Sequence, residues 1–431
     1  MKLLIKNGRV VDPISGTDDT LDVLITDGKI SAVEARIQEP GVPIIDASRL
    51  IVAPGFIDMH VHVREPGQEK KEDILSASRA AAKGGFTTIC AMPNTNPVND
   101  SRRVTEYIIS EARKRAVVNI LPIAAITTGL AGEEPTDMAD LAAAGAVAFS
   151  DDGRCVQNSW VMKKALEQAQ RLDVLVIDHC EDADLSRSGI MNEGPASVRL
   201  GFPGIPAVAE DVMVARDIIL AGAAGARIHI AHLSTRGAVD LVREAKRKKL
   251  SVTAEATPHH LLLSDAAVEN RDPNLKVNPP VRSAEDVQEL QKAVTEGVVD
   301  VLATDHAPHL PEHKDAGFIK APFGINGLET AVSLLLDRLV SRQILPLPRL
   351  VEMFSTRPAQ ILGLRGKGRI APGADADLTI LNLHQEFVVD VRKMVSKSRN
   401  NPFDGWKLKG GPQMTIRAGR VVYPFDFSPR I

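Results

Sequence analysis

From residue 55 onward, short apolar runs alternate with polar, alanine-rich stretches, and this alternation restricts the possible folds more than any other feature of the sequence. The runs have the length of buried strands, and several contain consecutive β-branched residues. Eight such runs occur, at residues 55–62, 86–93, 119–126, 145–152, 173–180, 226–233, 251–258 and 299–306. Strands that alternate with helices predict a parallel sheet, because parallel neighbours need long crossover connections.

The stretches between the runs have the composition of surface helices. Helices are expected over residues 69–84, 101–115, 158–171, 205–224, 235–249 and 283–296. Eight strands that alternate with helices favour an α/β fold of the (β/α)8 TIM-barrel type over residues 55–365. The competing architecture is a doubly wound open sheet, which would carry a glycine-rich phosphate-binding turn after an early strand. The early runs show no such turn, so the barrel is the prediction.

Strand-like segments also occur at both ends of the chain. Near the start, Asn7-Gly8 and Asp27-Gly28 are flanked by β-branched residues, and we expect a hairpin turn at each pair. Strand-like runs return late in the chain, at residues 367–381 and 414–423. Two separate mini-domains would each have a poor core. We therefore expect residues 1–54 and 366–431 to form one small composite β-domain, into which the barrel is inserted.

Composition excludes several classes of function. The net charge of −3 gives no electrostatic reason to expect nucleic acid or an anionic membrane as a partner. The longest apolar runs are too short to span a membrane, and the N-terminal residues alternate with lysines, unlike a signal peptide. Cys90, Cys155 and Cys180 are odd in number and widely spaced, so buried thiols are expected rather than a disulfide framework. A cytoplasmic protein is the expectation.

The first run of the barrel ends in residues that indicate chemistry. His60 and His62 are two residues apart, and because strand side chains alternate between faces, both imidazoles should point to the same side. Imidazole is a common ligand of zinc and other mid-row divalent metals. Arg64 has the same parity and lies two residues further on, where it would meet an anionic group of a substrate. The pattern predicts a metal site at the end of the first barrel strand.

Other runs also end in residues that can bind metals, and the active sites of such barrels lie at these strand ends. Beyond His60 and His62, the side chains are Asp151 or Asp152, His179, His232 and Asp305. Four histidines and two aspartates would supply three or four ligands to each of two ions, with room for a shared water. A two-metal site of this kind makes hydroxide available near neutral pH and polarises a carbonyl group.

Strand alternation also predicts which residues lie outside this site. His229 is three residues before His232, so it should lie on the opposite side of its strand, as a helix-facing or buried structural residue. Cys180 follows His179 and should point into the barrel wall. His259 and His260 follow the seventh run, and a structural role is preferred to a role around the metal ligands.

Several stretches together resemble the dihydroorotase family, in particular the bacterial class I enzymes of the cyclic amidohydrolase superfamily. They include Phe-Ile-Asp-Met-His-Val-His-Val-Arg at 56–64 and Ala-Thr-Asp-His-Ala-Pro-His at 303–309. The full set lies at residues 54–67, 91–97, 148–153, 232–235, 257–261, 276–282, 303–309 and 398–403. The resemblance extends over essentially the whole chain and includes the split β-domain.

The resemblance implies a role for each residue at the strand ends. The implied metal ligands are His60, His62, Asp152, His179, His232 and Asp305. The first two histidines and Asp305 would hold one Zn²⁺, the other two histidines a second, and Asp152 would bridge them, with one or two ions per subunit. In hydantoinases and some dihydroorotases a carboxylated lysine is the bridge, but residues 145–153 contain no lysine. This difference predicts activity that is independent of carbon dioxide.

The family's reaction is the reversible cyclisation of N-carbamoyl-L-aspartate to L-dihydroorotate in de novo pyrimidine (UMP) biosynthesis. The resemblance implies attack by zinc-bound hydroxide on the ring amide, with Asp305 as the catalytic residue that carries the proton. The implied substrate contacts are His62, Arg64, Asn94, Asn278, His309, Phe323 and Gly324. Of these, Arg64, Asn94 and His309 would bind the free carboxylate. Residues 308–318 form a polar loop that we expect to close over the substrate.

Two other functions compete with this interpretation. One is a hydantoinase or allantoinase activity, which would use the same barrel and metals on another cyclic amide. The other is a non-catalytic dihydroorotase-like partner of aspartate transcarbamoylase, in which metal ligands would be missing. The small-molecule substrate is the first expected partner. A second copy of the chain, as a homodimer, and aspartate transcarbamoylase are the candidate protein partners.

Overall fold

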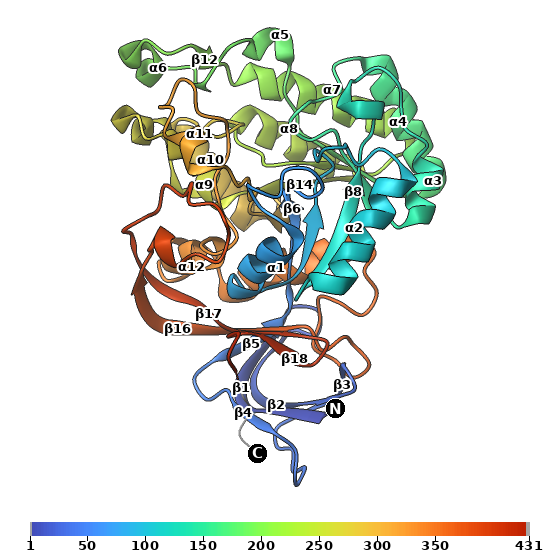
Figure 1. Ribbon diagram of the computed structural model, residues 1–431, viewed down its shortest axis with the longest axis vertical. Helices are drawn as coiled ribbons and strands as arrows, with labels where there is room; N and C mark the ends of the chain where they lie inside the picture. The colour runs from blue at the N-terminus through green and yellow to red at the C-terminus, as the bar shows by residue number, and fades with distance from the viewer. Residues whose placement is uncertain (1, 428–431) are drawn as a thin grey trace.

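The computed structural model describes residues 2–427, which form a barrel joined to a second, mixed sheet. Figure 1 shows the barrel with its surrounding helices in the upper part and the mixed sheet, built from both chain ends, in the lower part. None of the helices described in this range has both the length and the hydrophobicity that a membrane crossing requires. The predicted fold class, a barrel with a composite β-domain from both termini, is confirmed; the division of the chain at residues 55 and 365 stays a prediction.

The barrel sheet contains eight parallel strands, one in each predicted apolar run, in the order β15-β14-β13-β10-β9-β8-β7-β6. The strands are β6 Phe56–Val61, β7 Phe86–Ala91, β8 Asn119–Ala124, β9 Ala148–Phe149, β10 Leu175–Asp178, β13 Ile228–Ile230, β14 Val252–Ala256 and β15 Val301–Leu302. The first and last strands approach each other through a parallel bridge between Val61 and His306, with the His62 amide donating to the His306 carbonyl at 2.9 Å. This bridge brings the two ends of the strand order together, as a barrel requires.

Each of the six predicted helices is present, and others accompany them. The α-helices are α1 Ile74–Lys83, α2 Arg102–Arg115, α3 Met138–Ala144, α4 Ser159–Leu172, α5 Ala183–Ser186, α6 Pro195–Leu200, α7 Val208–Ala224, α8 Arg236–Arg247, α9 Pro258–Leu262, α10 Ala284–Glu296, α11 Pro311–Lys314, α12 Ala331–Leu335, α13 Leu347–Val351 and α14 Arg357–Ile361. Short 3₁₀ segments lie at Thr128–Leu130, Asp265–Asn270, Pro273–Leu275 and Val391–Lys393, and π-helical turns at Leu336–Val340 and Glu352–Thr356. The helix ends follow capping rules: α10 begins with a capping box at Ser283 and ends at Gly297, whose φ is 80°.

The second sheet combines strands from both ends of the chain in the order β18-β17-β16-β5-β1-β2-β3, with β4 beside β1. Its strands are β1 Lys2–Asp12, β2 Thr17–Thr26, β3 Lys29–Glu34, β4 Ile44–Asp46, β5 Ile51–Pro54, β16 Leu378–Val388, β17 Lys407–Arg417 and β18 Arg420–Tyr423. Antiparallel pairing of β5 with β16 joins the two halves. The other small sheet pairs β11 Met191–Asn192 with β12 Gly204–Ile205.

One of the two predicted hairpin turns is wrong. Asp27-Gly28 does connect β2 and β3, with φ values of 49° and 78° that suit a tight hairpin turn. Asn7-Gly8 instead lies within β1, where the pairing with β2 shifts register between Ile5 and Gly8. The pair therefore forms a β-bulge, and a side chain at Gly8 would collide with Val52 of β5. The Asn-Gly pair here allows two strands to approach closely and does not reverse the chain.

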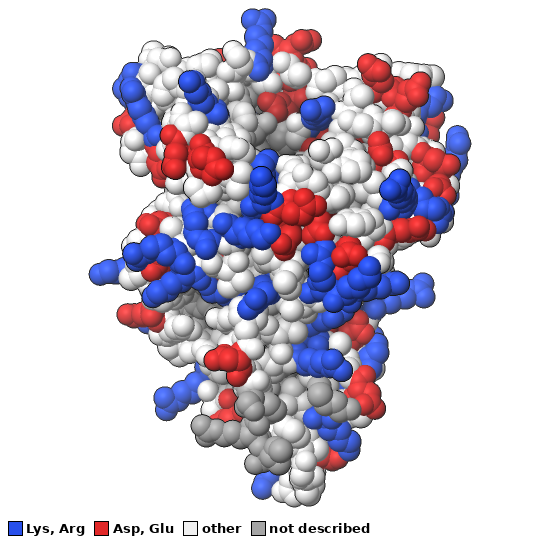
Figure 2. Space-filling model, in the orientation of Figure 1, with Lys and Arg blue, Asp and Glu red and all other residues white. Residues whose placement is uncertain are grey.

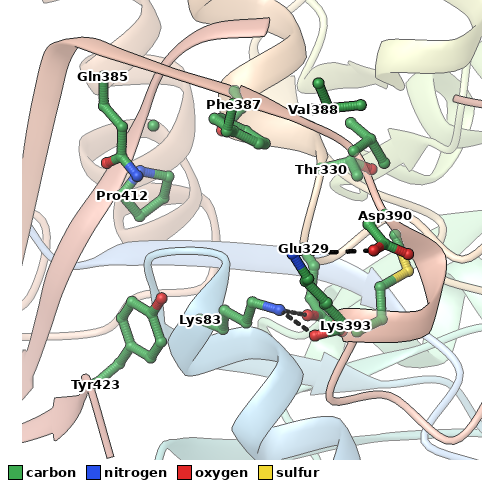
Figure 3. A pocket seen from close by; sticks show the side chains of 14 residues that line it. Lys83, Glu329, Thr330, Gln385, Phe387, Val388, Asp390, Lys393, Pro412 and Tyr423 are labelled. Atoms are coloured by element: carbon green, nitrogen blue, oxygen red, sulfur yellow. Dashed lines mark hydrogen bonds and ion pairs between the residues drawn. The ribbon is translucent and has the colours of Figure 1, made fainter. Parts of the chain in front are cut away.

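The barrel and the second sheet also meet at a cavity of about 260 Å³ between α1, α12 and β16–β17. Figure 3 shows Lys83 pointing toward Glu329, and the two side chains form an ion pair of 2.8 Å. The Lys83 ammonium also donates to the Lys393 carbonyl at 2.7 Å. Because these polar groups already have partners, we assign this cavity to the junction between the two sheets.

The barrel strands are shorter than the apolar runs that predicted them. β9 and β15 contain two residues each, and the polar residues at the ends of their runs lie in the loops that follow. Asp152 and Asp305 are among these residues. Except for His60, which lies in β6, the predicted metal ligands therefore lie on loops at the carboxyl ends of the strands.

Candidate metal centre and substrate cavity

The predicted metal ligands lie at or just beyond the carboxyl ends of the barrel strands. His60 is in β6, whereas the other five follow their strands directly or within a few residues: His62, Asp152, His179, His232 and Asp305. His232 and Asp305 have φ values of 28° and 46°, a backbone conformation that side chains seldom adopt outside functional sites. All six side chains are buried, with at most 6% of each residue exposed. The loops thus turn these side chains inward, over the end of the barrel.

The six side chains converge on one small volume. The ligand atoms of His60, His62 and Asp305 all lie within 4.8 Å of one another. So do those of His60, Asp152 and His232, which makes His60 common to both groups. His179 is adjacent, with Nδ1 2.9 Å from His232 Nε2 and 3.7 Å from Asp152 Oδ1. The structure therefore brings together every metal ligand implied by the resemblance; which of them binds an ion stays a prediction.

Three of the imidazoles are oriented by a second polar group. His60 Nδ1 lies 2.6 Å from Glu255 Oε1, and His62 Nδ1 lies 2.9 Å from Asn94 Oδ1. His179 Nε2 lies 3.0 Å from Glu181 Oε2. In each case the oxygen can accept the proton of one ring nitrogen, which leaves the other nitrogen of the ring free as a ligand toward the cluster. Glu255 and Glu181 were not predicted as part of the site.

The structure separates Asp151 from Asp152. Asp151 Oδ1 accepts hydrogen bonds from the amides of Ile126 and Thr127 at 2.7 and 3.0 Å, and Oδ2 accepts from the Thr127 hydroxyl. Asp151 therefore binds the loop after β8 and faces away from the imidazoles. Asp152 Oδ1 lies 3.2 Å from His60 Nε2, and Oδ2 lies 3.4 Å from His62 Nε2. The second aspartate is the one that lies among the histidines.

The electrostatics of the cluster favour added positive charge. Burial acts to lower the pKa of His60, but Asp152, Glu255 and Asp305 outweigh burial and hold that pKa well above its usual value. Burial also acts to raise the pKa of Asp152, yet the nearby His60, His232 and His62 hold it well below the usual range. Two buried atoms that face each other, His60 Nε2 and Asp152 Oδ1, have no hydrogen-bond partner. A nitrogen and oxygen donor set with unsatisfied buried atoms and excess carboxylate fits a divalent metal ion.

Replacing each aspartate separately tests this assignment. In Asp152→Ala we expect the affinity for metal to fall by more than about 100-fold, because a carboxylate in contact with the ions is lost. In Asp151→Ala we expect bound metal to be retained and the free energy of unfolding to fall by about 1–3 kcal/mol, because two buried amides lose their acceptor. Metal analysis of the purified proteins and urea unfolding distinguish the two; metal loss in Asp151→Ala alone would reverse the assignment.

His229 does not lie where strand alternation predicted. Its Nε2 is 3.2 Å from Glu255 Oε2, while the backbone amide of His232 donates to Oε1 of the same carboxylate at 3.3 Å. The His232 ring lies 5.1 Å, between centroids, from the ring of His60, which also contacts Glu255. Both histidine side chains therefore lie on the Glu255 side of the barrel, and the prediction of opposite sides is wrong. Alternation fails because β13 ends at Ile230 and the chain turns before His232. The expectation of a buried structural residue holds, since His229 is fully buried.

A cavity of about 560 Å³ opens beside the cluster. Its lining includes all the predicted substrate contacts, His62, Arg64, Asn94, Asn278, His309, Phe323 and Gly324, together with Asp152, His179, His232 and Asp305. A cavity of this size suits a small molecule. The face of the molecule seen in Figure 2 carries Lys and Arg in a broken band at the level of α1 and α2, with Asp and Glu interspersed. This face therefore presents no charge of a single sign.

Two arginines line this cavity, the buried Arg64 and the exposed Arg154. The buried Arg64 is the better placed to hold an anion away from solvent. Its guanidinium is buried, and Nε donates to the Pro308 carbonyl at 3.3 Å. Burial lowers the pKa of Arg64 to about 10, although Asp305 and Asp152 act in the opposite direction. The residue still carries a full charge at neutral pH. Because the buried guanidinium donates to a neutral carbonyl, the remaining donors of its planar fork are available to an anion in the cavity.

The other predicted contacts have partners in the free protein. His309 Nε2 donates to the Phe323 carbonyl at 2.7 Å, and burial together with Arg64 lowers the pKa of His309 to about 2, so the ring is neutral. Asn278 Nδ2 donates to Glu181 Oε2 at 2.7 Å. Asn94 uses its oxygen on His62, which leaves its amide nitrogen for a ligand. Binding a substrate carboxylate at His309 would thus require a change of protonation or ring orientation.

His260 and the three cysteines agree with structural roles. His260 lies between Thr257 Oγ1 and the Pro279 carbonyl, at 2.8 and 2.9 Å. His259 is buried, which lowers its pKa to about 4, and its Nε2 has no hydrogen-bond partner, so its structural role stays a prediction. The three cysteines are free and buried, as predicted. Cys180 contacts Asp178 and Asp217, and the Arg216 guanidinium lies 2.7 Å from Asp217 Oδ1.

Comparisons with known proteins identify the family. Residues 48–238 match the family model described as "Dihydro-orotase-like". The chain is 52% identical to the dihydroorotase of Pelotomaculum thermopropionicum, with 98% of both chains covered. It is 49% identical to the dihydroorotase of Syntrophus aciditrophicus, with 99% of this chain and 100% of the relative covered.

Among solved structures, the L-hydantoinase (dihydropyrimidinase) of Arthrobacter aurescens is similar, with a TM-score of 0.88 and 28% identity over 97% of this chain and 95% of the other. The structural likeness supports the barrel with its second sheet and a cyclic amidohydrolase fold. The sequence likeness is much closer and extends over the full length. The chain belongs to the dihydroorotase family.

Proposed function

We propose that this protein catalyses the reversible cyclisation of N-carbamoyl-L-aspartate to L-dihydroorotate in pyrimidine biosynthesis. The observation that carries the proposal is the buried Arg64 guanidinium, which faces the same cavity as the histidine and aspartate cluster. A cyclic amide with a free carboxylate satisfies both features, because its amide lies at the cluster when its carboxylate binds Arg64. The family membership of the chain supports the same reaction.

The metal would be held by His60, His62, Asp152, His179, His232 and Asp305. When bound, it supplies a water of lowered pKa and polarises the amide carbonyl. Arg64 orients the substrate by holding its carboxylate in a bidentate contact. Asn94 contributes its free amide nitrogen to the same end of the cavity. Orientation of this kind is a large part of enzymatic rate enhancement, because the reacting groups are already held in the geometry that the reaction needs.

Asp305 is proposed to move the proton. Its Oδ1 lies 3.2 Å from His62 Nε2 and 3.5 Å from His60 Nε2, and its carboxylate lines the cavity. Burial would raise the pKa of Asp305, but His60 and His62 hold it below the usual value, so the carboxylate is ionised and ready to accept a proton. In ring opening it accepts the proton of the attacking water and delivers it to the leaving ring nitrogen. In ring closure it takes a proton from the carbamoyl nitrogen.

We propose zinc as the metal, in one or two ions per subunit. Four imidazoles with carboxylates form a donor set that zinc accepts readily. We further propose a cytoplasmic location and retain the homodimer and a complex with aspartate transcarbamoylase as candidate assemblies. These assemblies are testable by light scattering of the protein alone and with the transcarbamoylase added.

Comparing two substrates tests the proposed activity. We expect the zinc-loaded protein to open L-dihydroorotate at least about 100-fold faster, as kcat/KM, than hydantoin, which lacks the carboxylate that Arg64 would hold. The loss of the ring amide's ultraviolet absorbance measures both reactions. The dihydroorotase of a close relative, assayed in parallel, controls for the assay conditions. Faster opening of hydantoin would instead support the second candidate, a hydantoinase-type activity, which the structural neighbours favour.

A further inference from the structure

Lys314, the last residue of α11, has an unusual environment. The residue is 4% exposed, and its ammonium donates to three backbone carbonyls. These acceptors are Pro322 at 2.8 Å, Pro273 at 3.0 Å and Lys276 at 3.3 Å. The three acceptors match the three donors of an ammonium group. All of them are neutral, so the charge is held by carbonyl dipoles.

The carbonyls that Lys314 binds lie next to the wall of the substrate cavity. Pro322 precedes Phe323 and Gly324, and Lys276 lies two residues before Asn278. The two segments also bind each other, since the Gly324 amide donates to the Lys276 carbonyl at 2.9 Å. The Lys314 side chain thus joins its own segment to both segments that supply this wall.

Burying this ammonium costs stability. Burial, assisted by the nearby Lys276 and opposed by Asp272, lowers the pKa of Lys314 to about 7. An apolar side chain of similar length would avoid the loss of hydration. The ammonium, unlike an apolar side chain, makes three directional hydrogen bonds, and these fix the positions of three carbonyls. Lys276 has a comparable contact, with Nζ 2.8 Å from the Ile319 carbonyl.

We propose that Lys314 is a positioning residue for the substrate cavity: its ammonium holds the 322–324 segment and the 273–278 segment at the spacing that the substrate ring requires. The inference rests on the proposed function and extends it to a residue outside the cavity lining. Lys314 touches neither the substrate nor the metal ligands. It acts through the backbone of Phe323, Gly324 and Asn278.

Lys314→Met tests the role, because methionine keeps an unbranched chain and removes the donors. We expect the KM for L-dihydroorotate to rise about tenfold while kcat stays within about threefold, since the wall loses its position and the proton-transfer group does not. Lys314→Gln, which retains two N–H donors, should recover part of the loss. Lys320→Met, at an exposed lysine six residues on, is the matched control and should behave as the unmodified protein.

Hydrogen exchange provides a second measurement that does not depend on turnover. In Lys314→Met we expect faster exchange at the amides of Phe323 and Gly324, with exchange in the barrel strands unchanged. A folded Lys314→Met with normal KM and normal exchange would overturn the proposal, as would a loss confined to kcat. If the unmodified protein opens no dihydroorotate, the proposed function fails instead, and the exchange measurement alone then decides the role of Lys314.

Discussion

Replacing Asp305 by asparagine is expected to lower the turnover of L-dihydroorotate by about 10²–10⁴-fold, the usual contribution of a positioned acid or base. The amide has nearly the same shape as the carboxylate, so it can remain beside His60 and His62. It cannot accept the proton of the attacking water, and therefore both reaction directions should lose rate together. Stopped assays of ring opening and ring closure measure the two directions.

Metal analysis separates this effect from loss of the cluster. Because Asp305 would contact one ion, whereas Asp152 would bridge two, we expect Asp305→Asn, and also Asp305→Ala, to retain most of the bound metal. Asp173→Asn is the control, since that carboxylate is 91% exposed and its backbone, with φ of 52°, suits asparagine. Normal turnover in a metal-loaded Asp305→Asn would remove Asp305 from the proton-transfer role.

Replacing Arg64 by methionine is expected to lower kcat/KM for L-dihydroorotate by about 30-fold or more, which corresponds to about 2–5 kcal/mol for a buried charge contact. Arg64→Lys should lose less, because it keeps the charge but not the planar fork. Arg64→Met should leave the thermal midpoint unaltered or raise it, since the guanidinium is buried and donates to a neutral carbonyl.

The combination of lower activity with unchanged or higher stability is specific to a binding residue. A residue that only supported the fold would lose both. Arg36→Met, at an exposed arginine of the composite sheet region, is the control for general effects of removing a guanidinium. If Arg64→Met opened dihydroorotate normally, the carboxylate would have to bind elsewhere in the cavity.

Much of the barrel was predictable because its strands are buried on both faces and therefore appear as continuous apolar runs. All eight runs contain a barrel strand, and all six predicted stretches contain a helix. The helices after β15 were not predicted. There the chain forms short α-helical and π-helical turns, such as Leu336–Val340, whose pattern of buried residues has no single period.

The histidines and aspartates of the cluster were predictable from the sequence, whereas the residues that orient them were not. His-x-His at the end of a run has a recognisable spacing, but Glu255 lies inside β14 and has no local signal in the sequence. Its role depends on His60 and His229, which come from other strands. His229 was misplaced for a related reason: strand alternation applies within β13 and ends where the backbone turns before His232.

Asn7-Gly8 illustrates the limit of turn signals. The pair allows positive φ, and Asn7 does have a φ of 60°. Whether such a conformation reverses the chain or makes a bulge depends on the strand beside it. Here β5 lies close to Gly8, and this neighbour is determined by tertiary structure rather than by local sequence.

The pairing of β5 with β16 has a consequence for how the protein is made. The junction brings together residues far apart in the chain; the Phe56 amide, for example, donates to a hydroxyl 323 residues away in sequence. On the ribosome, β1–β5 emerge long before β16. The edge of β5 therefore stays unpaired until the whole barrel has been synthesised. An unpaired edge is open to strands of other chains. Nascent chains should therefore be most vulnerable to aggregation, and most dependent on chaperones, in the interval before β16 is released.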